Sequence, residues 1–351
     1  MTIRVLIADD SPTILDLLRE VVSSDAQFEI VGTASNGSEA VALCRSLRPD
    51  VITMDMMMPV MSGLEATEEI MAYCPTPILI VSSSFNRGEI FKSYDALAAG
   101  AVDVLEKPAG TEPEGEWEAR LLSALRVIAR IRVITHLKAR NRHIPTRLDG
   151  ASAPSPSIPT KLLAIGASTG GPAAAVEVFR NLPIYVRIPV LFVLHLNAQF
   201  GHAFADWLAT QSPWPARFAR DGEPLQTAAG SIVLAPPDRH LILERGRLRL
   251  TDAPERHSCR PSIDVLFESI AIEMGSSAAA ALLTGMGRDG AAGLLAIRRA
   301  GGETIAQDEA SSVVYGMPRE AALNGGAKQI LPLVEIGPAL ANVVRPAWTL
   351  A

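Results

Sequence analysis

Acidic residues follow apolar runs at two points near the N-terminus of this 351-residue chain. Asp9 and Asp10 come directly after Ile3–Ala8, and Asp55 follows Val51–Met54. Because parallel strands end along one edge of a sheet, we expect these carboxylates to gather there. Clustered carboxylates repel one another and attract a hard divalent cation such as Mg²⁺, which also bridges to phosphate. The pattern predicts a phosphoryl-transfer site.

Two further polar residues at this edge complete the expected site. Ser82 comes at the end of the apolar run Ile78–Val81, and Lys107 follows the run Val102–Leu105. Asp55 is the predicted nucleophile toward a phosphohistidine donor, Asp9 and Asp10 would hold Mg²⁺, and the other two would bind the phosphoryl oxygens. Taken singly, each carboxylate is more typical of a helix cap or a solvated turn. Five polar residues at strand ends favour the phosphoryl site.

A serine flanked by small residues suggests a second chemistry. Ser168 lies in Gly166-Ala167-Ser168-Thr169-Gly170, directly after the apolar run Leu162–Ile165. The glycines permit a sharp turn from strand to helix, which leaves the hydroxyl exposed near helix N–H groups, as in a nucleophile elbow. From this motif alone, a glycine-rich phosphate-binding turn or a plain tight connection stays open.

A nucleophilic serine needs a base, and the base needs an orienting carboxylate. His195 follows the run Val190–Leu194, and Asp289 lies in the loop after Ala279–Leu283. All three residues fall at the carboxyl ends of predicted strands, so a Ser-His-Asp triad is possible in that chain order. A surface or core role stays open for any single histidine. The competing histidines are His136, His143, His202 and His240.

The loop that carries Asp289 has a second possible role. Gly285 and Gly287 allow a conformation in which backbone N–H groups, with Met286 a candidate, point at a developing oxyanion. Asp289 could instead serve as the N-cap of a helix that begins near Gly290. The two roles of this loop are compatible.

The apolar runs and the helix-length segments between them predict the fold class. Short β-rich runs alternate with helical periodicity in both halves, which is typical of α/β domains with a parallel sheet. The second half adds a predicted hairpin around Glu244-Arg245-Gly246. We therefore predict two doubly wound domains: residues 1–109, and residues 161–351 with a mostly parallel, Rossmann-like, hydrolase-type sheet. Residues 110–160 would hold an amphipathic connector helix, Trp117 to Lys138, and a mobile Pro/Ser-rich linker.

Bulk composition excludes several classes. A net charge of −6 argues against nucleic-acid binding. The three cysteines Cys44, Cys74 and Cys259 are widely spaced, which argues against a disulfide framework or a zinc site. Without a signal-peptide pattern or a membrane-length apolar run, we expect a soluble, cytoplasmic protein that is not inserted in a membrane.

The first domain resembles the receiver domains of two-component signalling. The matching segments are Ala8-Asp9-Asp10-Ser11, Met54-Asp55-Met56-Met57-Met58-Pro59 and Glu106-Lys107-Pro108. The resemblance implies a flavodoxin-like five-stranded fold, phosphorylation of Asp55 by a histidine kinase, and Mg²⁺ bound by Asp10, Asp55 and the Met57 carbonyl, with Asp9 acting directly or through water. Two positions depart from the pattern: Val104, often aromatic in receivers, and Met57, often polar or acidic.

The second domain resembles the catalytic domain of the chemotaxis protein-glutamate methylesterases. The matching segments are Ile165–Gly171, Arg260–Phe267, Leu283–Gly290, Ala306–Glu309 and Gly316–Pro318. The resemblance implies a triad of Ser168, His195 and Asp289, with Thr169 and Met286 as oxyanion or substrate contacts. It also implies hydrolysis of glutamate γ-methyl esters on methylated chemoreceptors and deamidation of certain glutamines, with no cofactor for that hydrolysis. Leu194, Asn197 and Cys259 depart from residues common in the family.

Domain order and resemblance together suggest regulation. We expect the unphosphorylated receiver to cover the active-site edge, and phosphorylation of Asp55 to release it. Two rival functions stay open at this point. One is a receiver-controlled docking protein with an inactive esterase domain, and the other is a hydrolase of a different ester or amide.

Overall fold

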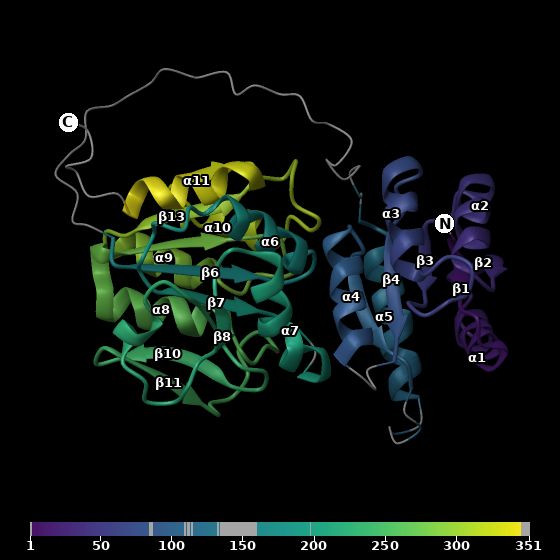
Figure 1. The fold of residues 1–351 in the computed structure, drawn as a ribbon, viewed down its shortest axis with the longest axis horizontal. Coiled ribbons are helices and arrows are strands. Elements are labelled where there is room, and N and C mark those ends of the chain that lie inside the picture. Colours follow the sequence, from purple (N-terminus) through teal and green to yellow (C-terminus); the bar gives the residue numbers. More distant parts are fainter. Residues whose placement is uncertain are drawn as a thin grey trace, which may run out of the picture. The chain divides into compact units, whose positions relative to one another are not determined.

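The computed structural model describes residues 2–83, 87–108, 110, 113, 115–131, 133, 160–196 and 198–344. The chain divides into two compact units, Met1–His136 and Leu137–Ala351 (Figure 1). Among the described helices, none combines the length and the apolar character that a bilayer crossing demands.

The first unit is built on a five-stranded parallel sheet with strand order β2-β1-β3-β4-β5. Helices α1 and α5 pack against each other on one face, and α2, α3 and α4 form the layer on the other face (Figure 1). The strands are β1 (Ile3–Ala8), β2 (Phe28–Ala34), β3 (Val51–Met54), β4 (Ile78–Ser82) and β5 (Asp103–Glu106). The helices are α1 (Pro12–Ser23), α2 (Gly37–Leu47), α3 (Gly63–Tyr73), α4 (Arg87–Ala98) and α5 (Glu116–Ile128). The predicted receiver-type architecture is confirmed.

Local sequence explains where these helices begin. Ser11 caps α1, with Pro12 at the first helical position, where a missing N–H costs nothing. Ser62 and Glu65 form a capping box at the start of α3. Both caps follow the loops after β1 and β3. They therefore set where α1 and α3 begin and lead the chain away from the acidic edge of the sheet.

The helix predicted as a connector belongs instead to the first unit. Helix α5 ends at Ile128, and its Leu121 and Leu125 side chains are fully buried. The Trp117 indole N–H donates to the Glu106 carbonyl, 2.7 Å away, which ties the helix to the end of β5. The apolar face of α5 packs against the receiver sheet, so this helix is not a free connector between the units. The predicted Pro/Ser-rich linker, residues 144–159, lies outside the described residues.

The second unit contains a seven-stranded sheet with order β14-β13-β12-β6-β7-β9-β8, and all its strand pairs are parallel. The strands are β6 (Leu162–Ala167), β7 (Val190–Leu194), β8 (Ala216–Phe218), β9 (Ile232–Leu234), β12 (Ala278–Leu282), β13 (Glu303–Gln307) and β14 (Gln329–Leu331). Strands β8, β13 and β14 were not predicted from the sequence. Two of these are edge strands of three residues, too short to show a periodic pattern.

Helices cover both faces of this sheet. Helices α6 (Gly171–Asn181) and α11 (Leu333–Val344) pack together on one face, while α8 (Ile263–Met274) and α9 (Ala291–Arg299) pack together on the other (Figure 1). The remaining helices are α7 (Ala198–Gln211) and α10 (Met317–Leu323), with short 3-10 turns at Leu225–Ala228 and Gly275–Ser277. The doubly wound second domain is confirmed.

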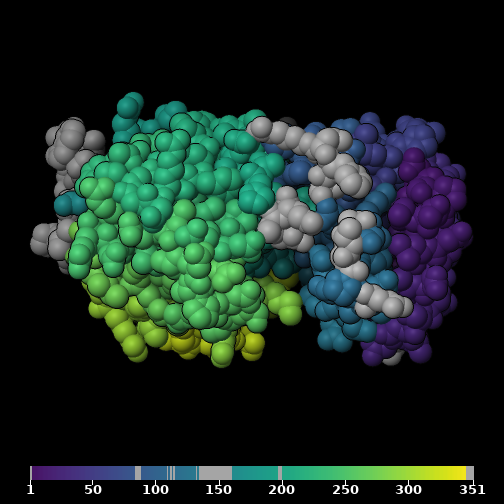
Figure 2. Space-filling model, turned by 90° about the horizontal axis from the view of Figure 1, so that it is seen from below, coloured from purple at the N-terminus to yellow at the C-terminus, as the bar shows by residue number. Residues whose placement is uncertain are grey.

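The predicted hairpin forms a separate two-stranded antiparallel sheet. Strands β10 (His240–Glu244) and β11 (Arg247–Thr251) pair around the turn Arg245-Gly246. Strand β10 packs against α8. In Figure 2 much of the visible face of this unit is green, the colour of the segment that includes the hairpin and its neighbours. The antiparallel addition therefore extends the α8 layer and leaves the main sheet entirely parallel.

Candidate active site

The acidic residues of the first unit meet at the carboxyl edge of its sheet. Carboxylate oxygens of Asp9, Asp10 and Asp55 lie within 4.8 Å of one another. Lys107 Nζ lies 2.8 Å from Asp9 Oδ2 and 2.8 Å from Asp55 Oδ1. Ser82 is buried at the end of the neighbouring strand β4. The sheet therefore brings the predicted phosphoryl-site residues to one edge.

Charge at this edge is only partly compensated. Burial raises the pKa of Asp9 more than the neighbouring Lys107 lowers it. Burial also disfavours the Lys107 ammonium, but Asp55 and Asp9 outweigh that effect and raise its pKa. One ammonium thus faces three carboxyl groups. A divalent cation would balance the remaining negative charge.

The donor set suits Mg²⁺. Asp9 Oδ2 is buried and accepts no aligned hydrogen bond from the described residues, although Lys107 lies beside it as an ion pair. Carboxylate oxygens with open access to water are the ligands that Mg²⁺ prefers. Asp10 is exposed, which leaves that access open. Gly63 matters for the shape of the loop, because a Cβ there would lie 1.9 Å from the Asp55 carbonyl oxygen.

Ser168 lies in the turn between β6 and α6, as its flanking glycines predicted. Gly170 has a φ of +76°, a conformation that glycine adopts without strain. The Ser168 N–H donates to the Thr284 carbonyl 3.0 Å away, which joins this turn to the loop after β12. A Cβ at Gly285 would lie 2.7 Å from Ser168 Cβ, so that loop can approach the serine only with glycine at this position.

His195 and Asp289 form a direct pair beside this turn. His195 Nε2 lies 2.9 Å from Asp289 Oδ2. The His195 backbone N–H donates to the Ala167 carbonyl, 3.1 Å away, which fixes the histidine next to the end of β6. The structure therefore brings Ser168 and the His195–Asp289 pair to the carboxyl ends of neighbouring strands.

The Asp289 carboxylate is held by the N-terminus of α8. Ser262 Oγ donates to Oδ1 at 2.7 Å, the Ile263 N–H donates to Oδ2 at 2.7 Å, and the Asp264 N–H donates to Oδ1 at 3.1 Å. Helix N-termini stabilise negative charge. The alternative role predicted for Asp289, N-cap of the helix near Gly290, is wrong: Gly290 itself is the N-cap of α9, without a side-chain cap.

These contacts set the charges of the pair. Burial would raise the pKa of Asp289, but hydrogen bonds from His195, Ser262 and Ile263 lower it below its ordinary value. Burial would lower the pKa of His195, but Asp289 and Cys259 raise it to about 9. The aspartate is therefore an anion that stabilises the imidazolium form of the histidine, as a triad carboxylate must.

The second ring nitrogen of His195 faces a cysteine. Cys259 Sγ lies 3.7 Å from His195 Nδ1. Among the described residues, the Ser168 hydroxyl has no hydrogen-bond partner. Because Asp289 contacts Nε2, Nδ1 is the ring nitrogen available as a proton acceptor. Catalytic hydrogen bonds commonly tighten only when substrate binds, so this arrangement is compatible with a triad.

Two backbone N–H groups near Ser168 are candidate oxyanion donors. The Thr169 and Met286 N–H groups donate no hydrogen bond within the described part of the chain. The Thr284 hydroxyl donates to the Thr169 carbonyl at 3.0 Å and accepts from the Val314 N–H at 2.9 Å. Buried Gln307 accepts from the Thr284 N–H at 2.8 Å. Side chains of neighbouring strands thus hold both loops. The exposed Met286 side chain is available to a substrate.

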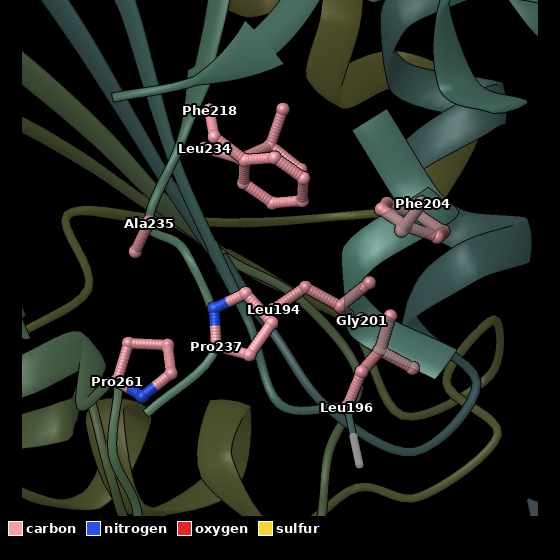
Figure 3. Close-up of a pocket in the computed structure, with 9 residues that line it drawn as sticks. All are labelled: Leu194, Leu196, Gly201, Phe204, Phe218, Leu234, Ala235, Pro237 and Pro261. Atoms are coloured by element: carbon pink, nitrogen blue, oxygen red, sulfur yellow. The ribbon is translucent and has the colours of Figure 1, made fainter. Parts of the chain in front are cut away.

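An apolar pocket lies against the strand that positions His195. Leu194 and Leu196 flank the histidine, and the other walls come from α7, β8, β9 and the Pro237 and Pro261 segments (Figure 3). Nearly all side-chain atoms drawn in the close-up are carbon. Leu194, one of the departures noted in the sequence, is buried in this wall. The pocket offers apolar contact beside the base.

Sequence reasoning missed the residues that support Asp289. Ser262 donates its hydroxyl to the carboxylate, and its N–H donates to His240 Nδ1 at 3.1 Å. His240 is fully buried, and its Nε2 lies 3.2 Å from the Pro254 carbonyl. His240 is therefore a structural histidine behind the site. Ser262 lies in the matching segment Arg260–Phe267, and a serine before an apolar helix ordinarily indicates no more than an N-cap.

Comparison with known proteins identifies both units. A model of the CheB methylesterase family matches residues 163–340, and a response regulator receiver domain model matches residues 5–113. The chain belongs to the CheB methylesterase family. A protein-glutamate methylesterase/protein-glutamine glutaminase of Anaeromyxobacter dehalogenans is 43% identical, covering 98% of this chain and 97% of that relative.

Further relatives agree with this assignment. A protein of the same description from Pseudomonas aeruginosa is 40% identical over 97% of this chain and 99% of its own length. The solved catalytic domain of Thermotoga maritima CheB methylesterase is 32% identical, with a TM-score of 0.50 over 53% of this chain and 100% of that domain. This chain therefore joins a receiver unit to a methylesterase unit, and carboxylic ester hydrolase is the enzyme class that its family indicates.

Proposed function

We propose that this protein hydrolyses γ-methyl esters of glutamate side chains on chemoreceptors and deamidates certain receptor glutamines. The observation that carries the proposal is the His195–Asp289 pair, 2.9 Å apart, beside the Ser168 turn. Relatives that share nearly the whole chain are described as protein-glutamate methylesterases and protein-glutamine glutaminases. This combination argues against the rival docking protein, since the groups that hydrolysis needs are present and supported.

The proposed reaction uses residues of the second unit. Ser168 Oγ attacks the ester carbonyl while His195 takes the serine proton. Backbone N–H groups of Thr169 and Met286 are suited to stabilise the oxyanion. His195 then protonates the departing methoxide, and methanol leaves. Water, deprotonated by His195, attacks the acyl-serine and releases glutamate. An amide side chain follows the same course with ammonia as the leaving group.

Asp289 acts in this scheme without gaining a proton. The N-terminus of α8 holds its carboxylate, and its lowered pKa keeps it charged. The anion favours the imidazolium that forms in each step. None of these steps uses a metal ion or an organic cofactor.

The receiver unit is proposed to regulate this chemistry. Asp55 would accept a phosphoryl group from a histidine kinase, while Lys107 and Ser82 contact its oxygens. Asp10, Asp55 and the Met57 carbonyl would hold Mg²⁺, with Asp9 beside them, and Mg²⁺ would neutralise the charge of the transferred phosphoryl group. Phosphorylation would shift the protein from a closed to an open population, because the receiver covers the substrate edge in the closed form. A cytoplasmic location stays a prediction.

Methanol release from methylated chemoreceptor membranes tests the activity directly. Wild-type protein should release methanol, and a small phosphodonor with Mg²⁺ should increase the rate. Release of ammonia from receptor glutamines tests the second activity. If the protein hydrolysed other esters but released no methanol from receptor methyl esters, the rival hydrolase would be favoured. If a fluorophosphonate probe failed to label Ser168, the docking protein would be favoured.

Deleting residues 1–145 tests regulation separately. If the receiver occludes the substrate edge, the remaining residues should turn over faster than the unphosphorylated whole chain. The gain is limited by the fraction of closed protein. A folded but slower fragment would show that the receiver assists catalysis or receptor binding.

A further inference from the structure

A thiol lies beside the ring nitrogen of His195 that Asp289 leaves free. Cys259 Sγ is 3.7 Å from His195 Nδ1, and the cysteine is partly exposed. The His195 side chain keeps 15% of its surface exposed. Atoms of these two residues and of Asp289 all lie within 4.8 Å of one another, as in a metal-ligand cluster. Water and small ions can therefore reach a pair of soft ligands.

The spacing of this pair fits one metal ion. In a tetrahedral zinc site, with Zn–S of about 2.3 Å and Zn–N of about 2.0–2.1 Å, sulfur and nitrogen ligands lie about 3.5 Å apart. The observed separation of 3.7 Å between Sγ and Nδ1 is close to that value. A slight closure of the Cys259 side chain would place both atoms at bonding distance from a shared ion.

The surroundings of His195 also match those of a metal-bound histidine. Ligating histidines ordinarily give their other ring N–H to a carboxylate, which fixes the ring. Asp289 Oδ2 contacts Nε2 at 2.9 Å, and the α8 N-terminus holds that carboxylate in turn. The imidazole is thus oriented so that its Nδ1 is directed toward the thiol.

We propose that Cys259 Sγ and His195 Nδ1 form a binding site for a soft divalent cation, with Zn²⁺ the best match. Thiolate and imidazole select zinc over Mg²⁺ and Ca²⁺, which prefer oxygen ligands. Asp289 orients the histidine from behind, and the two remaining tetrahedral positions are left to water or to substrate oxygens.

Two cationic side chains of the neighbouring segments, Arg256 and Arg288, contact other groups. Arg256 is paired with Glu268 and also lies 3.7 Å from the buried Asp264 carboxylate. The Arg288 Nε donates to His257 Nδ1 at 3.3 Å.

Zinc at this position would inhibit hydrolysis. The ion would occupy the nitrogen that takes the proton of Ser168, so His195 could no longer act as the base. This consequence rests on the proposed function, whereas metal binding itself does not. The spacing of the cysteines alone argues against a zinc site, but the fold supplies a histidine 64 residues away as the second ligand.

Two other metal-binding possibilities in the described chain can be separated from this one. Cys44 and Cys74 lie 3.4 Å apart in the first unit, but both are buried. Burial raises the pKa of Cys44 to about 12, so its thiol stays protonated and is a poor ligand. The acidic site of the first unit offers only oxygen, which excess Mg²⁺ would occupy.

Co²⁺ provides a direct test in the full-length protein. With excess Mg²⁺ present, Co²⁺ should produce a thiolate charge-transfer absorption in the near ultraviolet, and Zn²⁺ should abolish it by displacement. Cys259→Ser should lack this absorption and bind Zn²⁺ more than about tenfold more weakly in competition with a chromophoric chelator. Ser168→Ala and Cys74→Ser should retain both signals. An equal signal in Cys259→Ser, or none in the wild type, would overturn the site.

Hydrolysis measured in the same samples separates the two proposals. Zinc should inhibit wild-type methanol release, and the inhibiting concentration should rise more than about tenfold in Cys259→Ser. Thermal unfolding of each variant verifies that it is folded. Co²⁺ absorption without zinc inhibition would leave the metal site standing and remove His195 from the role of base. Inhibition that does not depend on Cys259 would place the inhibiting ion elsewhere and contradict the proposal.

Discussion

The two units place their reactive groups at the carboxyl edge of a parallel sheet but support them differently. In the first unit the carboxylates leave the strands directly. Lys107 lies 2.8 Å from both Asp9 and Asp55, and each of these two carboxylates accepts one backbone N–H hydrogen bond, from Ser11 and Met57 respectively. In the second unit Asp289 lies several residues beyond β12 and is balanced by backbone N–H groups of α8 as well as by His195.

This difference matches what each site must do. A site with uncompensated carboxylates can change its charge, because a cation and a phosphoryl group can enter it. A carboxylate fixed by a helix N-terminus keeps its charge and its position through a catalytic cycle. The first unit is thus suited to switching and the second to repeated turnover.

Replacing the predicted nucleophile should have the largest effect. Ser168→Ala should lower esterase activity by at least about 10⁴-fold, because triad members act as a unit. Methanol release measures the loss. Ser276→Ala, before β12 at the opposite edge of the sheet, is the matched control and should be near wild type. Ser168→Ala activity within tenfold of wild type would remove Ser168 from the reaction.

Replacing the predicted phosphoacceptor should act on the first unit alone. Asp55→Asn should abolish Mg²⁺-dependent phosphoryl incorporation from a small phosphodonor, since it removes the nucleophilic oxygen beside Lys107. Basal methanol release should persist, because the Ser168 site lies in the other unit. Asp50→Asn, at the start of β3, should still be phosphorylated. Continued incorporation into Asp55→Asn would assign the acceptor to another residue.

The sequence alone was sufficient to predict where the reactive groups that directly follow strands would lie. Asp9, Asp55 and His195 follow apolar runs, so the parallel-sheet rule alone predicted the edge at which they lie. The sequence was insufficient to predict contacts between elements that lie far apart in the chain. The clamp of Ser262 on Asp289 depends on how α8 packs beside the loop after β12, and the contact between Cys259 and His195 joins two loops 64 residues apart. Periodicity also misassigned α5, because an amphipathic stripe does not reveal which surface it covers.

Weakening the clamp on Asp289 should have an intermediate effect. Ser262→Ala removes the 2.7 Å hydrogen bond to Oδ1 but leaves the Ile263 and Asp264 N–H groups in place. Loss of one hydrogen bond to a charged group corresponds to about tenfold in rate. We expect kcat to fall by this factor with little change in KM. Ser269→Ala, on the same helix, should leave kcat unchanged. An effect as large as that of Ser168→Ala would show that the hydroxyl has a direct catalytic part.

The smallest predicted effect is a change in pH dependence. Burial pulls the pKa of His195 down, but Asp289 and Cys259 together raise it to about 9. Since only the neutral imidazole can accept the Ser168 proton, activity should rise with pH until it levels off near that value. Cys259→Ser removes the contribution of Cys259 to the raised pKa of His195. The pH of half-maximal activity should therefore move lower, and relative activity at neutral pH should increase.

The profiles should be recorded in a chelator, so that bound metal does not distort them. Cys74→Ser, which alters a buried thiol in the first unit, should keep the wild-type profile. A Cys259→Ser profile that coincides with that of the wild type would show that the thiol does not influence the base. A profile displaced to higher pH would mean that Cys259 lowers the pKa of His195, the reverse of the raising contribution expected from this side chain 3.7 Å from the ring. In that case Asp289 alone would have to raise the pKa of His195. The contrast between a switchable and a fixed site would then depend entirely on the hydrogen bonds from the N-terminus of α8 to Asp289.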